Sequence, residues 1–253
     1  MVLLDLQKAF DTVDHPTLLM KLASIGVNAF SRQWFSSYLQ GRQQLVDVGG
    51  TLSPPLPISC GVPQGSILGP LLFLIYVNDM KSAVTTKLLL YADDSAILVS
   101  GKSVLDIQTQ LSVELEAVHS WLVDNKLSLH LGKTEAIIFG SRQKLCKESK
   151  LKVTCNGQEI ESKTSVKYLG IDLDQKLNGE KTAKEIIQKC NAKLKFLFRY
   201  SKLMDERSRK QLASALILCR FDYACSVWYE CLTEYYKTNC KFVKIKQFVY
   251  ASI

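Results

Sequence analysis

Three aspartates next to apolar runs are the residues whose types and spacing most favour chemistry. Asp5 lies in the apolar run of residues 2–6, and Asp93 and Asp94 lie at a turn between two apolar runs within residues 88–99. Carboxylates gathered where strands meet repel one another unless a cation neutralises them. Their oxygens suit Mg²⁺, and two such ions about 4 Å apart promote in-line phosphoryl transfer. Taken alone, however, an Asp-Asp pair is also an ordinary turn sequence.

Five segments in order extend this pattern. They are LLDLQKAFDTVDH (residues 3–15), GVPQGS with LGPLLF (61–66 and 68–73), YADD (91–94), GKT (132–134) and YLGI (168–171). These segments resemble motifs A, B, C, D and E of the reverse transcriptases of non-LTR (LINE-like) retrotransposons, with compatible spacing. The resemblance covers residues 2–174, and residues 177–250 resemble the family's helical thumb more loosely. It implies an RNA-directed DNA polymerase.

Catalytic roles follow from the resemblance, motif by motif. It implies that Asp5 and Asp93 are the principal ligands of two Mg²⁺ ions, with Mn²⁺ as an alternative, and that Asp94 lies beside them. A DNA primer 3′-hydroxyl would attack the α-phosphate of a deoxynucleoside triphosphate (dNTP) opposite an RNA template, releasing pyrophosphate. Lys133 matches a family lysine that assists the departure of pyrophosphate by charge or proton donation. It could equally be an exposed lysine beside a strand.

Nucleotide-binding residues are implied in the same way. Phe10 matches an aromatic ring beneath the incoming sugar that would clash with a 2′-hydroxyl, which favours deoxynucleotides. Gln64 matches a residue that contacts the incoming nucleotide, and Gly65 lets the backbone approach the substrate closely. Tyr91 and Ala92 would line the primer terminus. Each has a structural alternative: Phe10 as a core residue, the glycine loop as a helix entry and Tyr91 as a packed strand end.

Positive charge is concentrated in the last third of the chain. Residues 175–253 hold 16 Lys and Arg against 7 Asp and Glu, a net charge of +9, whereas residues 1–174 have a net charge of −1. A basic segment with interspersed aromatic residues suits a nucleic-acid duplex, although a solvated helical face gives the same pattern. The predicted nucleic-acid-binding residues are Lys195, Arg199, Arg207, Arg209 and Lys210.

Aromatic residues of the basic segment are expected to pack inside it rather than to stack on bases. This holds for two phenylalanines among the charges, Phe196 and Phe198, and for a later group that would seal the helical domain. That group comprises Trp228, Tyr229, Tyr235 and Tyr236.

Hydrophobic periodicity indicates the elements that must position these residues. The sequence predicts a strand that ends at Asp5 and a helix that follows it directly and runs to Ile25. Further helices are predicted at 29–40, 67–80 and 104–125 and beyond 181, hairpins at 88–99 and around Asn156-Gly157, an extended region at 43–59, and strands at 136–139 and 168–173.

The predicted fold class is α+β, in two domains. Residues 1–178 would form the polymerase palm, an antiparallel sheet backed by helices, with motifs A to E. Residues 179–253 would form a basic α-helical thumb, with the boundary near Asn178-Gly179. The family places its fingers, with basic residues that hold the triphosphate, before motif A. Because Asp5 is so near the start of the sequence, we expect the fingers to be missing.

Cellular context is only weakly indicated. The eight cysteines form no C-x-x-C pair, which favours reduced thiols, and no apolar run is long enough for a transmembrane helix. The start of the sequence is unlike a signal peptide, so an intracellular protein of the nucleus or cytoplasm is expected. Oligomeric state is not indicated. The alternative function is that of a noncatalytic nucleic-acid-binding remnant of a truncated retrotransposon polymerase.

Overall fold

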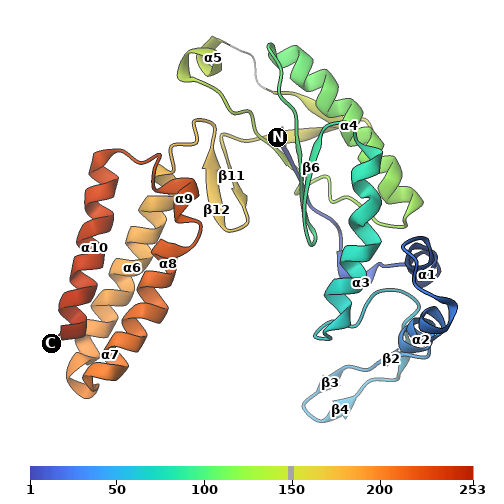
Figure 1. Cartoon of the computed structure of the whole chain (residues 1–253), viewed down its shortest axis with the longest axis horizontal. Coiled ribbons are helices and arrows are strands. Elements are labelled where there is room, and N and C mark those ends of the chain that lie inside the picture. The colour runs from blue at the N-terminus through green and yellow to red at the C-terminus, as the bar shows by residue number, and fades with distance from the viewer. Residues whose placement is uncertain (148–150, 253) are drawn as a thin grey trace. The chain divides into compact units, whose positions relative to one another are not determined.

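The computed structural model describes residues 1–147 and 151–252, which fall into two compact units (Figure 1). Unit 1 comprises residues 1–136 and 149–162, and unit 2 comprises residues 137–148 and 163–253. Both units contain helices as well as strands. This mixture confirms the α+β class.

Unit 1 is built on a six-stranded sheet in the order β6-β7-β1-β8-β10-β9. Its strands are β1 (Val2–Leu4), β6 (Lys87–Tyr91), β7 (Asp94–Leu98), β8 (Glu135–Ala136), β9 (Val153–Cys155) and β10 (Gln158–Ser162). Neighbouring strands are antiparallel except β8 and β10. Strands β1 and β7 lie next to each other inside the sheet, and each buries side chains completely, such as Val2 and Ile97.

Four helices accompany this sheet: α1 (His15–Ser24), α2 (Ala29–Leu39), α3 (Leu68–Val77) and α4 (Val104–Asp124). Helix α4 packs on β7 and β9, and its apolar residues at helical spacing, Leu111, Leu115 and Val118, are completely buried. Helix α3 packs on α1. Short hairpins join α2 to α3: β2 (Gln43–Gln44) pairs with β5 (Leu56–Pro57), and β3 (Asp47–Val48) pairs with β4 (Thr51–Leu52).

The predicted continuous helix between Asp5 and Ile25 is wrong in its first half. Lys8 has a φ of 46°, a short 3-10 turn follows at Ala9–Asp11, and α1 begins only at His15. The Asp14 side chain accepts a hydrogen bond from the backbone N–H of Thr17 at 3.0 Å and so caps the helix start. The sequence pattern missed this cap because the apolar residues continue across it.

Two predicted strands also differ in the structure. The strand expected at 136–139 is only the two-residue β8, Glu135–Ala136. The strand expected at 168–173 is instead a hairpin, β11 (Ser165–Tyr168) and β12 (Ile171–Asp174), which turns at Leu169 and Gly170 with φ values of 47° and 80°. The other predicted helices and hairpins are confirmed to within a few residues at their ends.

Unit 2 combines the β11–β12 hairpin with helices α5 (Arg142–Lys147), α6 (Glu180–Tyr200), α7 (Glu206–Ala213), α8 (Cys219–Asp222), α9 (Cys225–Trp228) and α10 (Glu234–Ser252). Its core gathers Cys190 and Leu194 of α6, Ile217 of the π-helical segment Ser214–Leu218 and Phe221 of α8 around Trp228. Tyr229, Tyr236 and Phe198 pack against this core, as expected, whereas Tyr235 and Phe196 are exposed.

The predicted domain boundary at Asn178-Gly179 falls inside unit 2. Hydrogen bonds join the hairpin to the start of α6: the Asp172 backbone N–H donates to Thr182 Oγ1 at 3.1 Å, and this hydroxyl donates to the Asp172 carbonyl. Lys181 also pairs with the Asp172 carboxylate at 2.6 Å. The hairpin therefore belongs with the helices, although it was predicted to belong to the preceding domain.

The cysteines that the structure describes, seven of the eight, are free thiols. Burial raises the pKa of Cys190 to about 11, and nearby Arg220 and Lys193 only partly oppose this shift. Cys146 lies outside the side chains that the structure describes. Of the described helices, none has the length and apolar character that crossing a membrane requires.

Candidate active site

The three aspartates converge at one end of the central strands of unit 1. Strands β1 and β7 pair in a register that sets Leu4 opposite Ser95, so that the same register continued by one step brings Asp5 opposite Asp94. Tyr91 pairs with Asp94 across the β6–β7 hairpin, which leaves Ala92 and Asp93 as a two-residue turn. Ala92 has a φ of 53°, as tight hairpin turns require. We call Asp5, Asp93 and Asp94 the acidic corner.

Electrostatics supports the convergence of these carboxylates. The pKa of Asp94 is raised, first by burial and then by repulsion from Asp93 and Asp5. An added cation would relieve this repulsion, so the corner fits a divalent ion bound by oxygen ligands. Within the residues that the structure describes, no group of three or more His, Cys, Asp or Glu side chains is arranged to hold a metal ion. The three carboxylates alone therefore do not form a metal site, and an ion there would need further oxygen ligands.

Backbone hydrogen bonds join Asp5 and its neighbour Gln7 to the segment that precedes β8. The backbone N–H of His130 donates to the Asp5 carbonyl at 2.7 Å, and the N–H of Gln7 donates to the Ser128 carbonyl at 2.8 Å. The backbone N–H of Lys133 in turn donates to His130 at 3.0 Å. Lys133 is exposed and lies in the turn that begins at His130. Its backbone is thus two hydrogen bonds away from Asp5.

The glycine-rich loop before α3 is joined to the chain that follows Asp5. Gly61 N–H donates to the Val13 carbonyl at 2.7 Å, and Val62 N–H donates to the Phe10 carbonyl at 2.8 Å. The His15 ring nitrogen Nε2 lies 2.7 Å from the Gly61 carbonyl oxygen and is buried. Gly61 has a φ of +88°, and a Cβ there would lie 2.7 Å from the Asp11 carbonyl oxygen. This close approach requires glycine.

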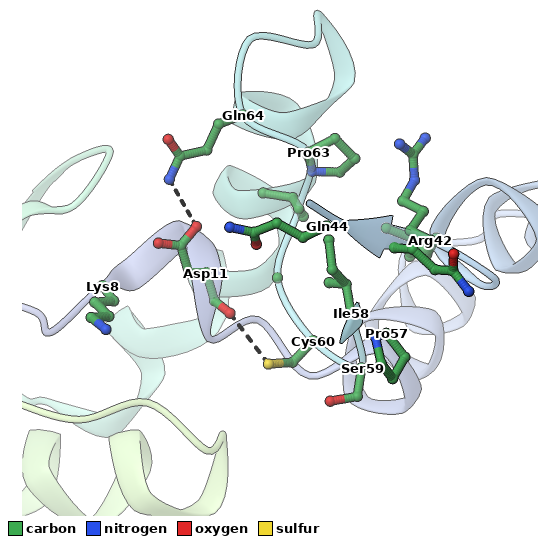
Figure 2. A pocket seen from close by; sticks show the side chains of 14 residues that line it. Lys8, Asp11, Arg42, Gln44, Pro57, Ile58, Ser59, Cys60, Pro63 and Gln64 are labelled. Carbon is green, nitrogen blue, oxygen red and sulfur yellow. Dashed lines mark hydrogen bonds between the residues drawn. The ribbon is translucent and has the colours of Figure 1, made fainter. Parts of the chain in front are cut away.

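Gln64 is held at the rim of a pocket of about 990 Å³. Its side-chain amide donates to the Asp11 carboxylate at 2.8 Å, and the Cys60 thiol donates to the Asp11 carbonyl at 3.3 Å, as Figure 2 shows. Lys8 lines the same pocket beside Asp11, and Arg42 lines it from the segment after α2. Sequence reasoning missed Asp11, Lys8 and Arg42. The first two lie inside the motif A segment, but Arg42 lies in none of the five motifs.

The remaining predicted nucleotide-binding residues have different environments. Phe10 is half-buried, and its ring lies 4.4 Å from that of Phe73, so it packs as a core residue while leaving part of its surface accessible. Tyr91 is 65% exposed at the hairpin tip. Gly65 has a φ of +77° and open space around it. The acidic corner itself does not line the Gln64 pocket.

The predicted basic surface of unit 2 is only partly accessible. Lys195, Arg199 and Arg207 are exposed on α6 and α7. Lys210 is exposed but forms an ion pair with Glu206 one helical turn earlier. Arg209 donates to the Met204 carbonyl at 3.0 Å and to the Ser201 carbonyl at 3.3 Å, so it holds the connection between α6 and α7.

One aromatic ring joins this surface against expectation. Phe196 is 57% exposed and lies 4.8 Å from the Tyr200 ring. It therefore adds apolar area to the charged face of α6 instead of packing in the core.

Known proteins are similar in sequence to this chain over most of its length. The chain is 34% identical over 202 residues to the RNA-directed DNA polymerase from mobile element jockey of Drosophila melanogaster, a match that covers 76% of this chain and 21% of that relative. The jockey polymerase of Drosophila funebris is 35% identical over 69% of this chain and 19% of its own length. The chain thus spans about a fifth of the length of these relatives.

A third relative matches a larger share of this chain. The probable RNA-directed DNA polymerase from transposon BS of Drosophila melanogaster is 28% identical over 90% of this chain and 26% of its own length. The family described as reverse transcriptase (RNA-dependent DNA polymerase) matches residues 1–173, and that range contains the acidic corner and the Gln64 pocket. These findings confirm the resemblance to retrotransposon polymerases, and the chain belongs to the reverse transcriptase (RNA-dependent DNA polymerase) family.

Proposed function

We propose that this chain carries the nucleotidyl-transfer site of an RNA-directed DNA polymerase of the non-LTR retrotransposon kind. The observation that carries the proposal is the acidic corner, where strand pairing brings Asp5 towards Asp94 and where burial, followed by repulsion from Asp93 and Asp5, raises the pKa of Asp94. Such a corner is suited to Mg²⁺, or to Mn²⁺, and to phosphate oxygens that complete the coordination. When bound, a pair of such ions would supply charge stabilisation and an activated primer hydroxyl.

The chain's own residues then have separate tasks. Asp5, Asp93 and Asp94 would bind the metal ions. The exposed Lys133 neutralises the negative charge that develops on the departing pyrophosphate. Gln64 and the open backbone at Gly65 bind the incoming dNTP. Phe10 limits the space beneath its sugar, and Tyr91 and Ala92 contact the primer end. Asp11 orients Gln64 by accepting its amide hydrogen bond at 2.8 Å.

The two units would serve as palm and thumb. Unit 1 presents the sheet with the acidic corner, and unit 2 presents exposed positive charge at Lys195, Arg199 and Arg207. Exposed Lys and Arg side chains attract the phosphates of a template and primer duplex, an interaction that weakens with salt. The partners are accordingly an RNA template, a DNA primer and dNTP. A nuclear or cytoplasmic place of action is part of the proposal.

Primer extension by the full 253-residue chain tests this function. We expect dNTP-dependent extension on an RNA template with Mg²⁺. The double variant Asp93→Asn, Asp94→Asn should lower the rate at least about a thousandfold, because charge stabilisation by metal ions is worth several kcal/mol. The variant Asp124→Asn, at the end of α4, removes one carboxylate elsewhere in unit 1 and is the matched control.

The alternative is a noncatalytic nucleic-acid-binding protein, which the exposed basic side chains of unit 2 favour. Binding of a template and primer duplex without any extension by the folded wild-type chain would support this alternative and contradict the polymerase proposal. Extension that survives the double variant would also contradict the assignment of the acidic corner.

A further inference from the structure

Helix α2 presents an aromatic stripe on its surface. Phe30, Trp34 and Tyr38 follow one another at intervals of four residues along one face of the helix, which ends at Leu39, and Arg42 follows in the segment after it. At 1.5 Å per residue the three aromatic residues span about 12 Å of the helix. We call these four residues the α2 stripe.

Three of the four side chains of the stripe are already stacked on one another. The rings of Trp34 and Tyr38 are nearly parallel, with an interplanar angle of 8° and centroids 5.6 Å apart. The Arg42 guanidinium carbon lies 4.7 Å from the centroid of the Tyr38 ring. Its Nε donates to the Tyr38 carbonyl at 2.8 Å, which fixes the arginine over the ring. Little side-chain freedom is left to lose when a planar ligand adds to this stack.

This face of α2 is open to solvent. Phe30 is 82% exposed and Trp34 is 53% exposed, whereas Leu39, on the side that faces the protein core, is 1% exposed. Large aromatic side chains are usually at least half-buried, and exposed ones grouped on one face indicate a binding surface. The core of unit 1 does not need these rings, since Leu39 already anchors the helix.

Charge indicates what kind of partner fits. Residues 15–46 contain Lys21, Arg32 and Arg42 but no aspartate or glutamate. The Lys21 charge is neutralised by Asp79 at 2.5 Å. Arg32 is half-buried and lies two residues from both Phe30 and Trp34, off the stripe, so Arg42 supplies the positive charge of the stripe itself. A positive, aromatic face is complementary to unpaired bases on a phosphate backbone, because bases stack on rings and on guanidinium planes while phosphates pair with arginine.

Position links the stripe to the pocket described above. Arg42 ends the stripe and also lines the pocket that contains Gln64. Figure 2 labels Arg42 and Gln64 around this same pocket. A strand that occupies the pocket would therefore reach the stripe directly at Arg42.

We propose that the α2 stripe binds single-stranded nucleic acid as the strand passes the Gln64 pocket. Bases stack on Trp34 and Phe30, and Arg42 contacts a phosphate. The inference goes beyond the proposed polymerase function, because it assigns a strand-binding surface outside the acidic corner and requires no catalysis.

Fluorescence anisotropy with the full chain and a labelled single-stranded oligouridine tests the inference. Trp34→Ala should weaken binding at least about fivefold, since stacking of one base on an aromatic ring is worth about 1–3 kcal/mol. Trp34→Tyr should restore most of the affinity, because the ring is kept. The control is Tyr235→Ala, which removes a ring on α10 that is 71% exposed and should leave the affinity unchanged.

Tryptophan emission gives a second readout of location. The chain has three tryptophans, and Trp228 is buried. Oligouridine should quench the emission of the wild type, and Trp34→Tyr should lose this quenching while still binding. Equal affinities of the wild type and Trp34→Ala, or quenching that persists in Trp34→Tyr, would overturn the inference. A Trp34→Ala variant that binds oligouridine normally but changes its self-association would assign the stripe to a protein partner instead.

The two proposals fail separately in these experiments. The variant Asp93→Asn, Asp94→Asn should bind oligouridine like the wild type even though it cannot extend a primer. Trp34-dependent binding by a chain with no extension activity would support the stripe without the polymerase. Primer extension by a chain whose oligouridine affinity does not depend on Trp34 would support the polymerase proposal and refute the role proposed for the α2 stripe.

Discussion

The acidic corner of unit 1 and the basic surface of unit 2 position their charges by different means. Strand pairing and backbone hydrogen bonds determine where Asp5 and Asp94 lie, and the turn at Ala92 determines where Asp93 lies. On α6 and α7, side chains such as Lys195 and Arg207 lie exposed on a helix surface. The first arrangement suits contacts at fixed distances, and the second suits a diffuse attraction to phosphates.

The largest effect should come from disturbing the backbone that supports the site in unit 1. Gly61→Ala would combine a positive φ with a Cβ 2.7 Å from the Asp11 carbonyl oxygen. We expect a loss of about 3 kcal/mol in the free energy of unfolding, since strain at such a position and a backbone clash each cost about 1–3 kcal/mol. Urea denaturation measures this loss.

Gly65→Ala is the matched control for this substitution. Gly65 also has a positive φ, of +77°, but nothing lies near its missing Cβ. We expect a loss of about 1 kcal/mol, from backbone strain alone. If both variants lose the same stability, the close approach at Gly61 is not what fixes the loop.

A smaller and graded effect is expected on the basic surface. Replacing Lys195 and Arg199 with glutamine should weaken duplex binding about tenfold at moderate salt, irrespective of the base sequence. It should also lower the slope of log affinity against log salt by about 2, one unit for each lost phosphate contact. Salt titrations followed by anisotropy measure both quantities. Arg209→Gln should instead lower the stability, because Arg209 holds the carbonyls of Ser201 and Met204.

The smallest effect concerns stability as a function of pH. The pKa of Asp94 is raised above its ordinary value of 3.8 in the folded chain, so the folded state binds more protons than the unfolded state as the carboxyl titrates. The contribution of Asp94 to stability therefore falls as pH rises through this window. Asp94→Asn should be more stable than the wild type at pH 7, by less than about 1 kcal/mol because solvent screens the repulsion.

Denaturation of both proteins at pH 3 and pH 7 checks the sign of this effect. The stability advantage of Asp94→Asn should vanish at the lower pH, where the wild-type carboxyl is protonated. Adding Mg²⁺ at pH 7 should raise the thermal midpoint of the wild type but not that of the double variant Asp93→Asn, Asp94→Asn. An advantage of Asp94→Asn that is equal at both pH values would contradict burial and repulsion of the charged carboxylate as its cause.

The sequence predicted those parts of the fold that local patterns determine. The apolar spacing of α4 and the turn residues of the Asn156-Gly157 hairpin correspond to physical requirements of single elements, and both predictions are confirmed. The break before His15 was missed because a cap and a left-handed Lys8 interrupt an otherwise continuous apolar pattern. The exposure of Phe196 was missed because burial depends on which face of its helix packs against the core.

The candidate site was predictable where residues act near one another in sequence. Asp93 and Asp94 are neighbours at a turn, and Asp5 was recognisable from its motif. The contact between Asp11 and Gln64 spans 53 positions, and Arg42 reaches the pocket from a segment without a motif. Such contacts depend on the tertiary arrangement of loops, which neither composition nor periodicity encodes. The roles assigned to these residues stay predictions until the variants are measured.

The path of the chain between the units has a consequence for folding. The chain leaves unit 1 after Ala136, contributes α5 to unit 2, returns to form β9 and β10, and then leaves unit 1 for good after Ser162. During ribosomal synthesis, the sheet therefore stays incomplete until residue 162 has emerged, long after β1 is available. A fragment that ends at Ala136 would lack two of six strands and expose the edge of β8, which could then pair with a strand of another molecule. A single break in the chain therefore cannot separate the two units as complete fragments.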